Sequence, residues 1–220
     1  MTRLSIFDMD RTITRTGTYT PWLIFWAARE APWRLALLPI SAVYGAAYLL
    51  KAVTRSRLKE LNHALLMGGG ARRAAVERRA AEYAVRVVER NVFAGAIARL
   101  ATERAEGRRI VLATASYEFY VRAIAARLGI VDVIATGSVW DGDRLRPLLA
   151  GENCYGPAKL RMVEAWLARV DATDAHIRFF SDHVSDLPVF ERAAEQIATT
   201  PSPKLRAVAE ARGWQVIDWQ

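Results

Sequence analysis

Two aspartates, Asp8 and Asp10, lie two positions apart at the end of a short, largely apolar run of residues 3–7. Carboxylates this close to a buried strand need partners or a function, because burying an unpaired charge is costly. Other chemically active side chains also follow apolar runs or begin a helix. These residues are Thr114, Ala115 and Ser116, then Lys159, then Asp182 and Asp186.

Four carboxylates gathered at one edge of a protein would repel one another and raise each other's pKa. A hard divalent cation with oxygen ligands removes this repulsion, and Mg²⁺ suits such ligands best. A phosphate group beside it can be held by Lys159, a hydroxyl and the backbone N–H groups of a helix start. One aspartate can then attack as a nucleophile while the other moves the proton. These residue types predict phosphoryl chemistry with Mg²⁺ as cofactor.

Alternating strands and helices are expected to bring these side chains together. Strands are predicted at residues 109–116, 176–182, 195–200 and 214–219, with helices between them. Such alternation is typical of a parallel sheet covered by helices on both faces. Ligands bind beyond the C-terminal ends of the strands in such sheets. We therefore expect an α/β fold with a Rossmann-like parallel sheet core.

The segment from Tyr19 to about Glu106 is rich in Ala, Leu, Arg and Glu, which favours helices. Breaks near Pro32, at the three glycines 68–70 and near residues 91–95 divide it into four or five helices. We expect an all-helical cap inserted between the first strand and the second strand–helix unit. The predicted cap is residues 15–98, and the predicted catalytic core is residues 1–14 and 99–220.

The motifs resemble those of the haloacid dehalogenase superfamily of phosphatases. "DMDRT" resembles its Asp-x-Asp-x-Thr motif, and "VLATAS" is similar to its second motif. Lys159 in "NCYGPAK" resembles the third motif, and "FFSDHVSDLP" resembles the acidic fourth motif. The cap position resembles the phosphoserine-phosphatase-like branch. Residues 201–219 resemble the tail of bacterial members related to phosphatidylglycerophosphate phosphatases.

This resemblance implies a Mg²⁺-dependent phosphatase that forms an aspartyl-phosphate. Asp8 is implied as the nucleophile and a metal ligand. Asp10 is implied as the general acid and base, with its backbone carbonyl on the metal. Asp182 would bind Mg²⁺, and Asp186 would bind it directly or through a neighbouring group.

The same resemblance implies the groups that hold the substrate. Thr114 and Lys159 would bind the phosphoryl group, and Lys159 would also restrain Asp8. Thr12 would orient Asp10, and Thr12, Ala115 and Ser116 are expected at the substrate. Ser116 has a second interpretation as the N-cap of the following helix, which we favour, and both roles could hold together.

Two residues depart from the family pattern, and three others suggest no chemistry. Many members carry Gly where this chain has Arg11, so Arg11 either points to solvent or adds positive charge to the pocket. His183 replaces a small residue, and a structural role is at least as plausible as a place at the metal site. Cys154 has no evident neighbouring base, and His63 and His176 lack ligand spacing, so we interpret all three as structural, packing or surface residues.

The net charge of +8 is concentrated in the predicted cap. From Arg15 to Ala98 the chain has 13 Lys and Arg residues against 5 Asp and Glu residues, whereas the remainder has 18 of each. A basic surface attracts acidic lipid, nucleic acid or phosphorylated substrates, but a solvated arginine-rich face is the simplest interpretation of the charge alone. We expect no nucleic-acid binding, because the aromatic residues cluster in the apolar part of the cap.

Residues 35–50 form a stretch without a charged side chain. It is apolar all round, which is typical of a helix that is buried on every side or lies in lipid. Its 16 residues are fewer than the roughly 20 needed to span a bilayer. Trp22, Trp26 and Trp33 lie at its edge, as at a membrane interface. The stretch is expected to meet an anionic membrane surface, its own cap core or a partner chain, and the oligomeric state is left open.

Composition sets the broad class. The chain has 220 residues, of which 52% are hydrophobic and 25% charged, as in a globular protein of one or two domains. The single cysteine excludes an internal disulfide, and the N-terminal residues lack a signal-peptide pattern. A cytoplasmic protein is predicted, peripheral on the inner face of the membrane if the cap meets lipid.

The predicted function is hydrolysis of a phosphomonoester. The substrate is expected to be a phospholipid phosphate or a small soluble phosphomonoester such as phosphoserine. A non-catalytic, membrane-associated binding protein on the same fold is the alternative. That alternative is disfavoured because every motif residue is present.

Overall fold

Eight strands form one sheet in the computed structural model, which describes residues 2–219. The strand order is β2-β5-β4-β3-β1-β6-β7-β8. From β4 to β8 all neighbours are parallel, and β5 and β2 extend the sheet in antiparallel fashion. The predicted α/β fold is confirmed. The strands are β1 Arg3–Phe7, β2 Ala71–Arg72, β3 Arg109–Tyr117, β4 Asp132–Asp141, β5 Arg144–Ala150, β6 His176–Ser181, β7 Glu195–Thr199 and β8 Gln215–Ile217.

The helices follow the predicted segments closely. The predicted breaks near Pro32, at the glycines 68–70 and before Ala94 are present, and a further break at residues 50–54, which was not predicted, separates α2 from α3. The two-residue strand β2, which pairs with β5, is an addition that the sequence does not predict. The helices are α1 Tyr19–Glu30, η1 Pro32–Leu37, α2 Leu38–Leu49, α3 Arg55–Leu66, α4 Arg73–Arg90, α5 Ala94–Ala105, α6 Glu118–Arg127, α7 Pro157–Arg169, η2 Val184–Asp186, α8 Leu187–Arg192 and α9 Pro203–Ala211.

Apolar side chains cover both faces of the central strands. Along β1, Leu4 and Ile6 join a buried cluster with residues of α7, α8 and α9. Phe7 faces the other way, into a cluster with α4, α5 and α6, and its ring stacks on Phe180 with centroids 4.0 Å apart. Burial on both faces explains why these strands are nearly continuous apolar runs.

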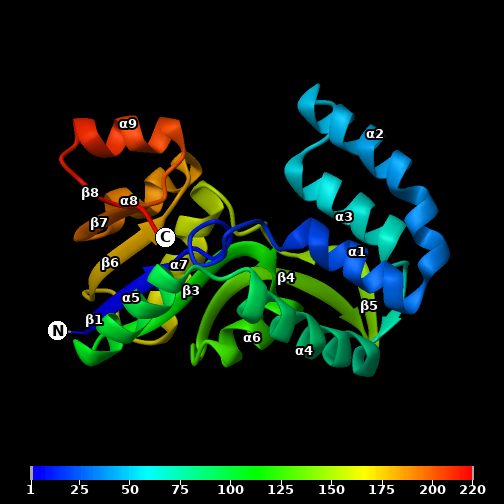
Figure 1. Cartoon of the computed structure of the whole chain (residues 1–220), viewed down its shortest axis with the longest axis horizontal. Helices are drawn as coiled ribbons and strands as arrows, with labels where there is room; N and C mark the ends of the chain where they lie inside the picture. Colours follow the sequence, from blue (N-terminus) through cyan, green and yellow to red (C-terminus); the bar gives the residue numbers. More distant parts are fainter. Residues whose placement is uncertain (1, 220) are drawn as a thin grey trace.

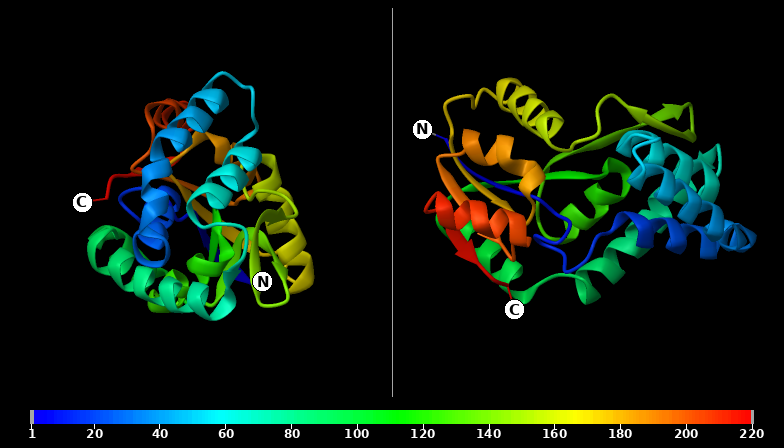
Figure 2. Two further views of the ribbon diagram at one scale, coloured as in Figure 1. Left: turned by 90° about the vertical axis from the view of Figure 1, so that its right-hand side faces the viewer. Right: turned by 90° about the horizontal axis from the view of Figure 1, so that it is seen from above.

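The helices α1, η1, α2 and α3, residues 19–66, form an outer helical unit at one end of the molecule (Figure 1). Within this unit α2 packs against α3, and α3 also packs against β5. The right-hand view of Figure 2 shows the β4–β5 hairpin reaching toward these helices. By contrast, α4 packs along α6. The segment 15–98 therefore contains the outer helical unit and a helix that lies along the sheet layer.

The apolar stretch 35–50 is not buried in the outer helical unit. Every residue of α2 is at least partly exposed. Val43 is 64% exposed and Leu49 is 79% exposed. Complete burial in the cap core is therefore wrong, because one side of α2 packs on α3 and η1 while the other side is exposed. Within residues 2–219, no helix combines the length and apolar character needed to cross a bilayer.

The tryptophans expected at a membrane interface divide into two groups. Trp22 is completely buried and Trp26 is nearly so, both within the core cluster that includes α4 and α6. Trp33, at the start of η1, is 65% exposed. A place at a membrane interface is thus wrong for Trp22 and Trp26, because α1 turns its aromatic face inward. For Trp33 it stays a prediction.

Candidate active site

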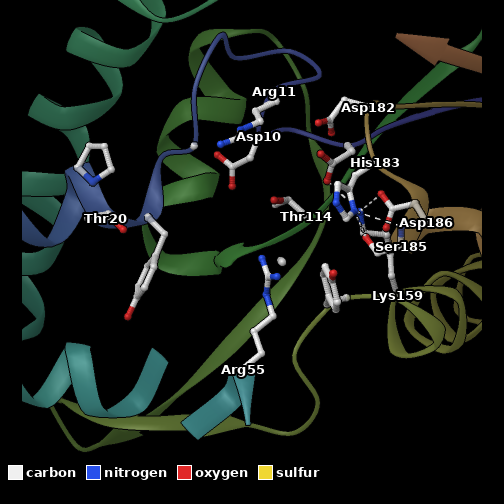
Figure 3. Close-up of a pocket in the computed structure, with 16 residues that line it drawn as sticks. Asp10, Arg11, Thr20, Arg55, Thr114, Lys159, Asp182, His183, Ser185 and Asp186 are labelled. Atoms are coloured by element: carbon white, nitrogen blue, oxygen red, sulfur yellow. Dashed lines mark hydrogen bonds and ion pairs between the residues drawn. The ribbon is translucent and has the colours of Figure 1, made fainter. Parts of the chain in front are cut away.

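The C-terminal ends of β1, β3 and β6 open onto a cavity of about 430 Å³ (Figure 3). Parallel strands bring their C-terminal ends to one edge, which explains why residues far apart in the sequence meet here. The core contributes most of the predicted residues, and the outer helical unit contributes the opposite wall. The lining residues are Asp8, Asp10, Arg11, Gly17, Tyr19, Thr20, Pro21, Arg55, Thr114, Ala115, Tyr155, Lys159, Asp182, His183, Ser185 and Asp186.

Lys159 links two of the carboxylates at the base of the cavity. Its Nζ donates to Asp8 Oδ1 at 2.8 Å and to Asp186 Oδ2 at 2.6 Å. The same Asp186 oxygen accepts a hydrogen bond from Ser181 Oγ at 2.7 Å. Lys159 is 2% exposed, and these two carboxylates engage two of the three N–H groups of its ammonium. The predicted restraint of Asp8 by Lys159 is present.

Negative charge exceeds positive charge at this point. Burial, together with the carboxylates of Asp186 and Asp182, raises the pKa of Asp8 in spite of the Lys159 ammonium. Burial and Asp186 likewise raise the pKa of Asp182 to about 6. Burial opposes the charge of Lys159, but Asp186 and Asp8 together raise its pKa. One ammonium therefore does not neutralise three carboxylates.

Asp10 is held apart from this cluster by its own partners. Its Oδ1 accepts from the backbone N–H of Thr18 at 2.7 Å, and its Oδ2 accepts from Ser116 Oγ at 2.7 Å. Two hydrogen bonds from different segments fix the carboxylate at the cavity wall. This arrangement suits a group that exchanges a proton with a bound molecule.

The structure corrects the expected roles of Thr12 and Ser116. Thr12 is completely buried, and its hydroxyl lies 3.4 Å from Asp182 Oδ1, so it supports Asp182 rather than Asp10. Ser116 is 2% exposed and binds Asp10, so neither residue lines the cavity. Ser116 is not the N-cap of α6 either, because β3 continues through Tyr117, which takes the N-cap position.

The segment after Thr114 is an irregular part of the sheet. The pairing of β3 with β4 changes register between Thr114 and Tyr117. Such an irregularity re-aims side chains at a strand end. Thr114 and Ala115 line the cavity as predicted. Ser116 points back to Asp10, and its N–H donates to Thr114 Oγ1 at 3.1 Å.

The residues fit a divalent cation in part. Among residues 2–219, no three His, Cys, Asp or Glu side chains form a ready ligand cluster. However, Asp186 Oδ1 is buried without a hydrogen-bond partner in the described chain, and the acidic cluster retains excess charge. Mg²⁺ typically takes only one or two protein carboxylates and completes its shell with water and phosphate oxygens. Asp8, Asp182, the Asp10 carbonyl and Asp186 are the groups that would hold it.

Two cavity features follow from departures in the motifs. Arg11 lines the cavity and is exposed, so both of its expected positions hold in part. His183 also lines the cavity, but its Nδ1 accepts from the N–H of Ser185 at 3.1 Å and caps η2. Burial lowers the pKa of His183. Its structural interpretation is therefore supported, because the cap shapes the turn that carries Asp186.

Arg55 is the main cavity residue that the sequence does not single out. It projects from the first turn of α3 toward Asp10 and Thr114 (Figure 3). Its guanidinium also lies 4.0 Å from the ring centroid of Tyr155. One more arginine in a basic helical segment carries no motif, so only the packing of α3 over the strand ends reveals it.

The cysteine and the two other histidines fit structural roles. Cys154 is completely buried, and burial raises the pKa of its thiol to about 12. His63 is completely buried between aromatic rings, with its centroid 5.6 Å from that of Tyr117. His176 lies at the start of β6, with Nδ1 3.6 Å from Glu195.

A family model described as haloacid dehalogenase-like hydrolase matches residues 6–191. The chain therefore belongs to the haloacid dehalogenase-like hydrolases. The match includes Asp8, Asp10, Thr114, Lys159 and both acids of the fourth motif. The resemblance found in the motifs is confirmed.

The chain is also similar to individual proteins. A Mycobacterium tuberculosis protein named "Probable phosphatase" is 30% identical over 128 residues, which are 58% of this chain and 44% of that protein. A phosphoserine phosphatase of the same organism is 26% identical over 114 residues, 52% of this chain and 37% of that protein. The chain thus spans less than half the length of these relatives. A solved Bordetella pertussis structure of unknown function is 28% identical, covers 99% of both chains and has a TM-score of 0.89.

Proposed function

We propose that this chain is a Mg²⁺-dependent phosphatase that hydrolyses phosphomonoesters through an aspartyl-phosphate on Asp8. The observation that carries the proposal is the pairing of Asp8 with Lys159 beside a separately held Asp10, in one open cavity. A restrained nucleophile and an independent proton-exchanging group are what two-step phosphoryl transfer requires. The family match supports the proposal.

These residues can supply the nucleophile, the proton transfers and the phosphate contacts of both chemical steps. A carboxylate oxygen of Asp8 attacks phosphorus, the bond to the leaving oxygen breaks, and Asp10 gives that oxygen a proton. Water then attacks the phosphorus, Asp10 takes its proton, and the Asp8–phosphorus bond breaks to release phosphate. Lys159 and Thr114 bind the transferred group. A bound Mg²⁺ would offset the excess negative charge and polarise the phosphoryl oxygens.

We further propose that the natural substrate is a phosphomonoester on an anionic lipid. The outer helical unit faces the cavity with Tyr19, Thr20 and the cation Arg55, while all four acids of the cavity come from the catalytic motifs. A leaving group with an additional negative charge would pair with Arg55. The ammonium of an amino acid would have to compete for carboxylates already engaged at the phosphoryl group.

The exposed helix α2 supports a lipid surface as the location of that substrate. Its exposed apolar side chains are followed directly by Lys51, and Arg55 is exposed on the next helix. Apolar side chains with adjacent cations are complementary to an anionic bilayer surface. We propose peripheral contact with the cytoplasmic leaflet through α2.

A soluble phosphoserine-type phosphatase is the second candidate. It is favoured by the similarity to a relative named phosphoserine phosphatase. The third possibility, a binding protein without catalysis, predicts that loss of Asp8 changes no activity. One assay separates the three.

The test is phosphate release in the presence of Mg²⁺ from phosphatidylglycerophosphate in anionic vesicles and from soluble phosphoserine. We expect Asp8-dependent turnover with kcat/KM at least about tenfold higher for the lipid, as a single added ion pair can provide. Asp8→Asn is the control and should abolish turnover of both. Faster turnover of phosphoserine would select the second candidate. Turnover that survives in Asp8→Asn would reject Asp8 as the nucleophile, and no turnover at all in the wild type would reject the phosphatase assignment.

A further inference from the structure

Lys59 is a buried cation where α3 meets the end of β3. It is 6% exposed, and its Nζ donates to the Ala115 carbonyl at 2.6 Å and to Asn153 Oδ1 at 2.9 Å. The ammonium also lies 4.4 Å from the ring centroid of Tyr117. Burial and the neighbouring Arg55 lower the pKa of Lys59 to about 7. Burial of a lysine ammonium costs free energy unless hydrogen bonds compensate for the lost water.

Lys59 completes a hydrogen-bond network around two oxygens, the Ala115 carbonyl and Asn153 Oδ1. Thr136 alone cannot donate to both of them. Thr136 Oγ1 lies 2.7 Å from the Ala115 carbonyl and 3.0 Å from Asn153 Oδ1, and it accepts from the N–H of Cys154 at 3.1 Å. A hydroxyl has one proton and can donate to only one of these two oxygens at a time. Lys59 has three N–H groups, so it keeps both oxygens bonded.

This network holds the backbone around Ala115, where the pairing of β3 with β4 is irregular. Ala115 lies within the register shift between β3 and β4, where regular ladder bonds are interrupted. It is flanked by Thr114, which lines the cavity, and by Ser116, which holds Asp10. A displacement of the Ala115 carbonyl would therefore be transmitted to Thr114 at the cavity and to Ser116, which positions Asp10.

Lys59 also fixes the opposite wall of the cavity. Arg55 precedes Lys59 by four residues on α3, so the two side chains lie on the same face of the helix. The hydrogen bonds of Lys59 hold that face against the end of β3. Arg55 reaches the cavity from this position.

We infer that Lys59 is a positioning residue that locks the outer helical unit onto the phosphate-binding end of β3. Through this contact it sets the place of Arg55 on one side and of Ser116 and Asp10 on the other. Nothing in the motifs assigns Lys59 a role. The inference rests on the proposed phosphatase function for its kinetic consequence, and on the structure alone for its effect on α3.

The kinetic test compares two substrates that differ in their need for Asp10 in the first step, the attack of Asp8 on phosphorus. Glycerol phosphate has a poor leaving group that requires a proton, whereas the acetate of acetyl phosphate leaves without one. Lys59→Met keeps the length of the side chain and removes its donors. We expect its rate of Asp8 phosphorylation, measured in a single turnover, to fall about tenfold or more with glycerol phosphate and less than about threefold with acetyl phosphate. Lys59→Arg should restore most of the loss.

Amide hydrogen exchange of α3 provides a second readout that does not depend on turnover. We expect faster exchange of α3 in Lys59→Met than in the wild type. Arg57→Met, an exposed change on the same helix, is the matched control and should alter neither exchange nor kinetics. If Lys59→Met does not fold, Asn153→Leu is the second variant, because it removes one acceptor of the Lys59 ammonium. It should also lose more rate with glycerol phosphate than with acetyl phosphate, but both losses should be smaller.

The outcomes that overturn the inference are distinct from failure of the proposed function. Equal losses with both substrates in the folded variant, or kinetics and exchange like those of Arg57→Met, would reject the role of Lys59. A wild type without Asp8-dependent turnover would reject the phosphatase function. The exchange of α3 would then decide the inference about Lys59.

Discussion

Arg11 adopts a backbone conformation that favours glycine, directly after Asp10. Its φ angle is +66°, in the left-handed region. The chain reverses here, because the N–H groups of Ile13 and Thr14 both bond the carbonyl of Met9 at 2.9 Å. A side chain with a Cβ costs roughly 1–2 kcal/mol in that conformation. The charge of Arg11 at the cavity is a reason for keeping it.

Replacement of Arg11 separates these two effects. Arg11→Gly should raise the free energy of unfolding by about 1 kcal/mol, because the strain disappears. It should also raise KM for an anionic phosphomonoester several-fold, because a cation leaves the cavity. Urea denaturation and steady-state kinetics measure the two quantities.

Arg11→Ala is the matched control, since it removes the charge and retains the Cβ. It should share the higher KM without the gain in stability. Equal stability of the Gly and Ala variants would show that the φ angle of Arg11 is not a source of strain.

The sequence predicts the cavity residues well where a strand end places them. Asp8, Asp10 and Asp182 follow buried strands, Thr114 lies near the C-terminal end of β3, and parallel pairing brings them together. The supporting role of Ser116 was not predictable, because it depends on how far β3 extends. The direction of a short hydroxyl side chain is decided by one or two residues of strand length, which propensities do not fix.

At the scale of elements, α3 shows that a helix in the middle of a basic segment can carry buried polar groups. His63 and Lys59 lie on this helix, and both are buried beside Tyr117. Neither nitrogen of His63 has a hydrogen-bond partner in the described chain. Burial, and then the Lys59 charge, lower the pKa of His63 to about 4. The lone histidine predicted as a surface or packing residue is a packing residue.

His63 should make stability depend on pH in a defined window. The unfolded chain binds a proton at this group near the ordinary pKa of about 6.5, whereas the folded chain does so only near 4. The unfolded state therefore gains protons first, and stability falls as the pH drops from 6.5 to 4. At pH 5 this loss should be roughly 1–2 kcal/mol.

His63→Leu removes that contribution and leaves the other titrating groups in place. The free energy of unfolding, measured with urea at pH 7.5, 6 and 5, should decline less steeply in the variant than in the wild type. Parallel declines for the two proteins would contradict the buried, neutral state of His63.

The sequence predicts most elements but not the surroundings of α2. Alternating strands and helices, with glycines and prolines at their ends, locate the elements from their own residues. Hydropathy indicates only that α2 avoids water and does not say what covers it. The packing of α1 decides this, because its tryptophans fill the interior and leave α2 outside.

At the scale of the whole molecule, charge and exposed apolar surface coincide. The excess of basic residues falls within residues 15–98, and α2 lies at the outer end of the same segment (Figure 1). The cavity lies between the outer helical unit and the ends of the sheet strands. A bilayer that binds α2 would therefore bring its headgroups near Arg55.

Flotation with anionic vesicles tests this arrangement. The wild type should float at low salt and less at high salt, because screening weakens the attraction of basic residues. Val43→Glu should reduce the bound fraction about tenfold, since burial of an apolar side chain contributes roughly 1.5–3 kcal/mol. Val131→Glu, at a residue 85% exposed outside the outer helical unit, is the control and should change little. A wild type that stays unbound at low salt, or an equal loss in both variants, would contradict membrane contact through α2.

The central claim is that Asp8 forms a covalent bond to phosphorus. Asp10→Asn with acetyl phosphate and Mg²⁺ should trap this state, because acetate leaves without a proton and the attacking water lacks its base. Acid quenching and mass spectrometry of peptides should then show phosphate on Asp8, and Asp8→Asn should remain unlabelled. Phosphate on another residue, or hydrolysis that continues in Asp8→Asn, would contradict the account.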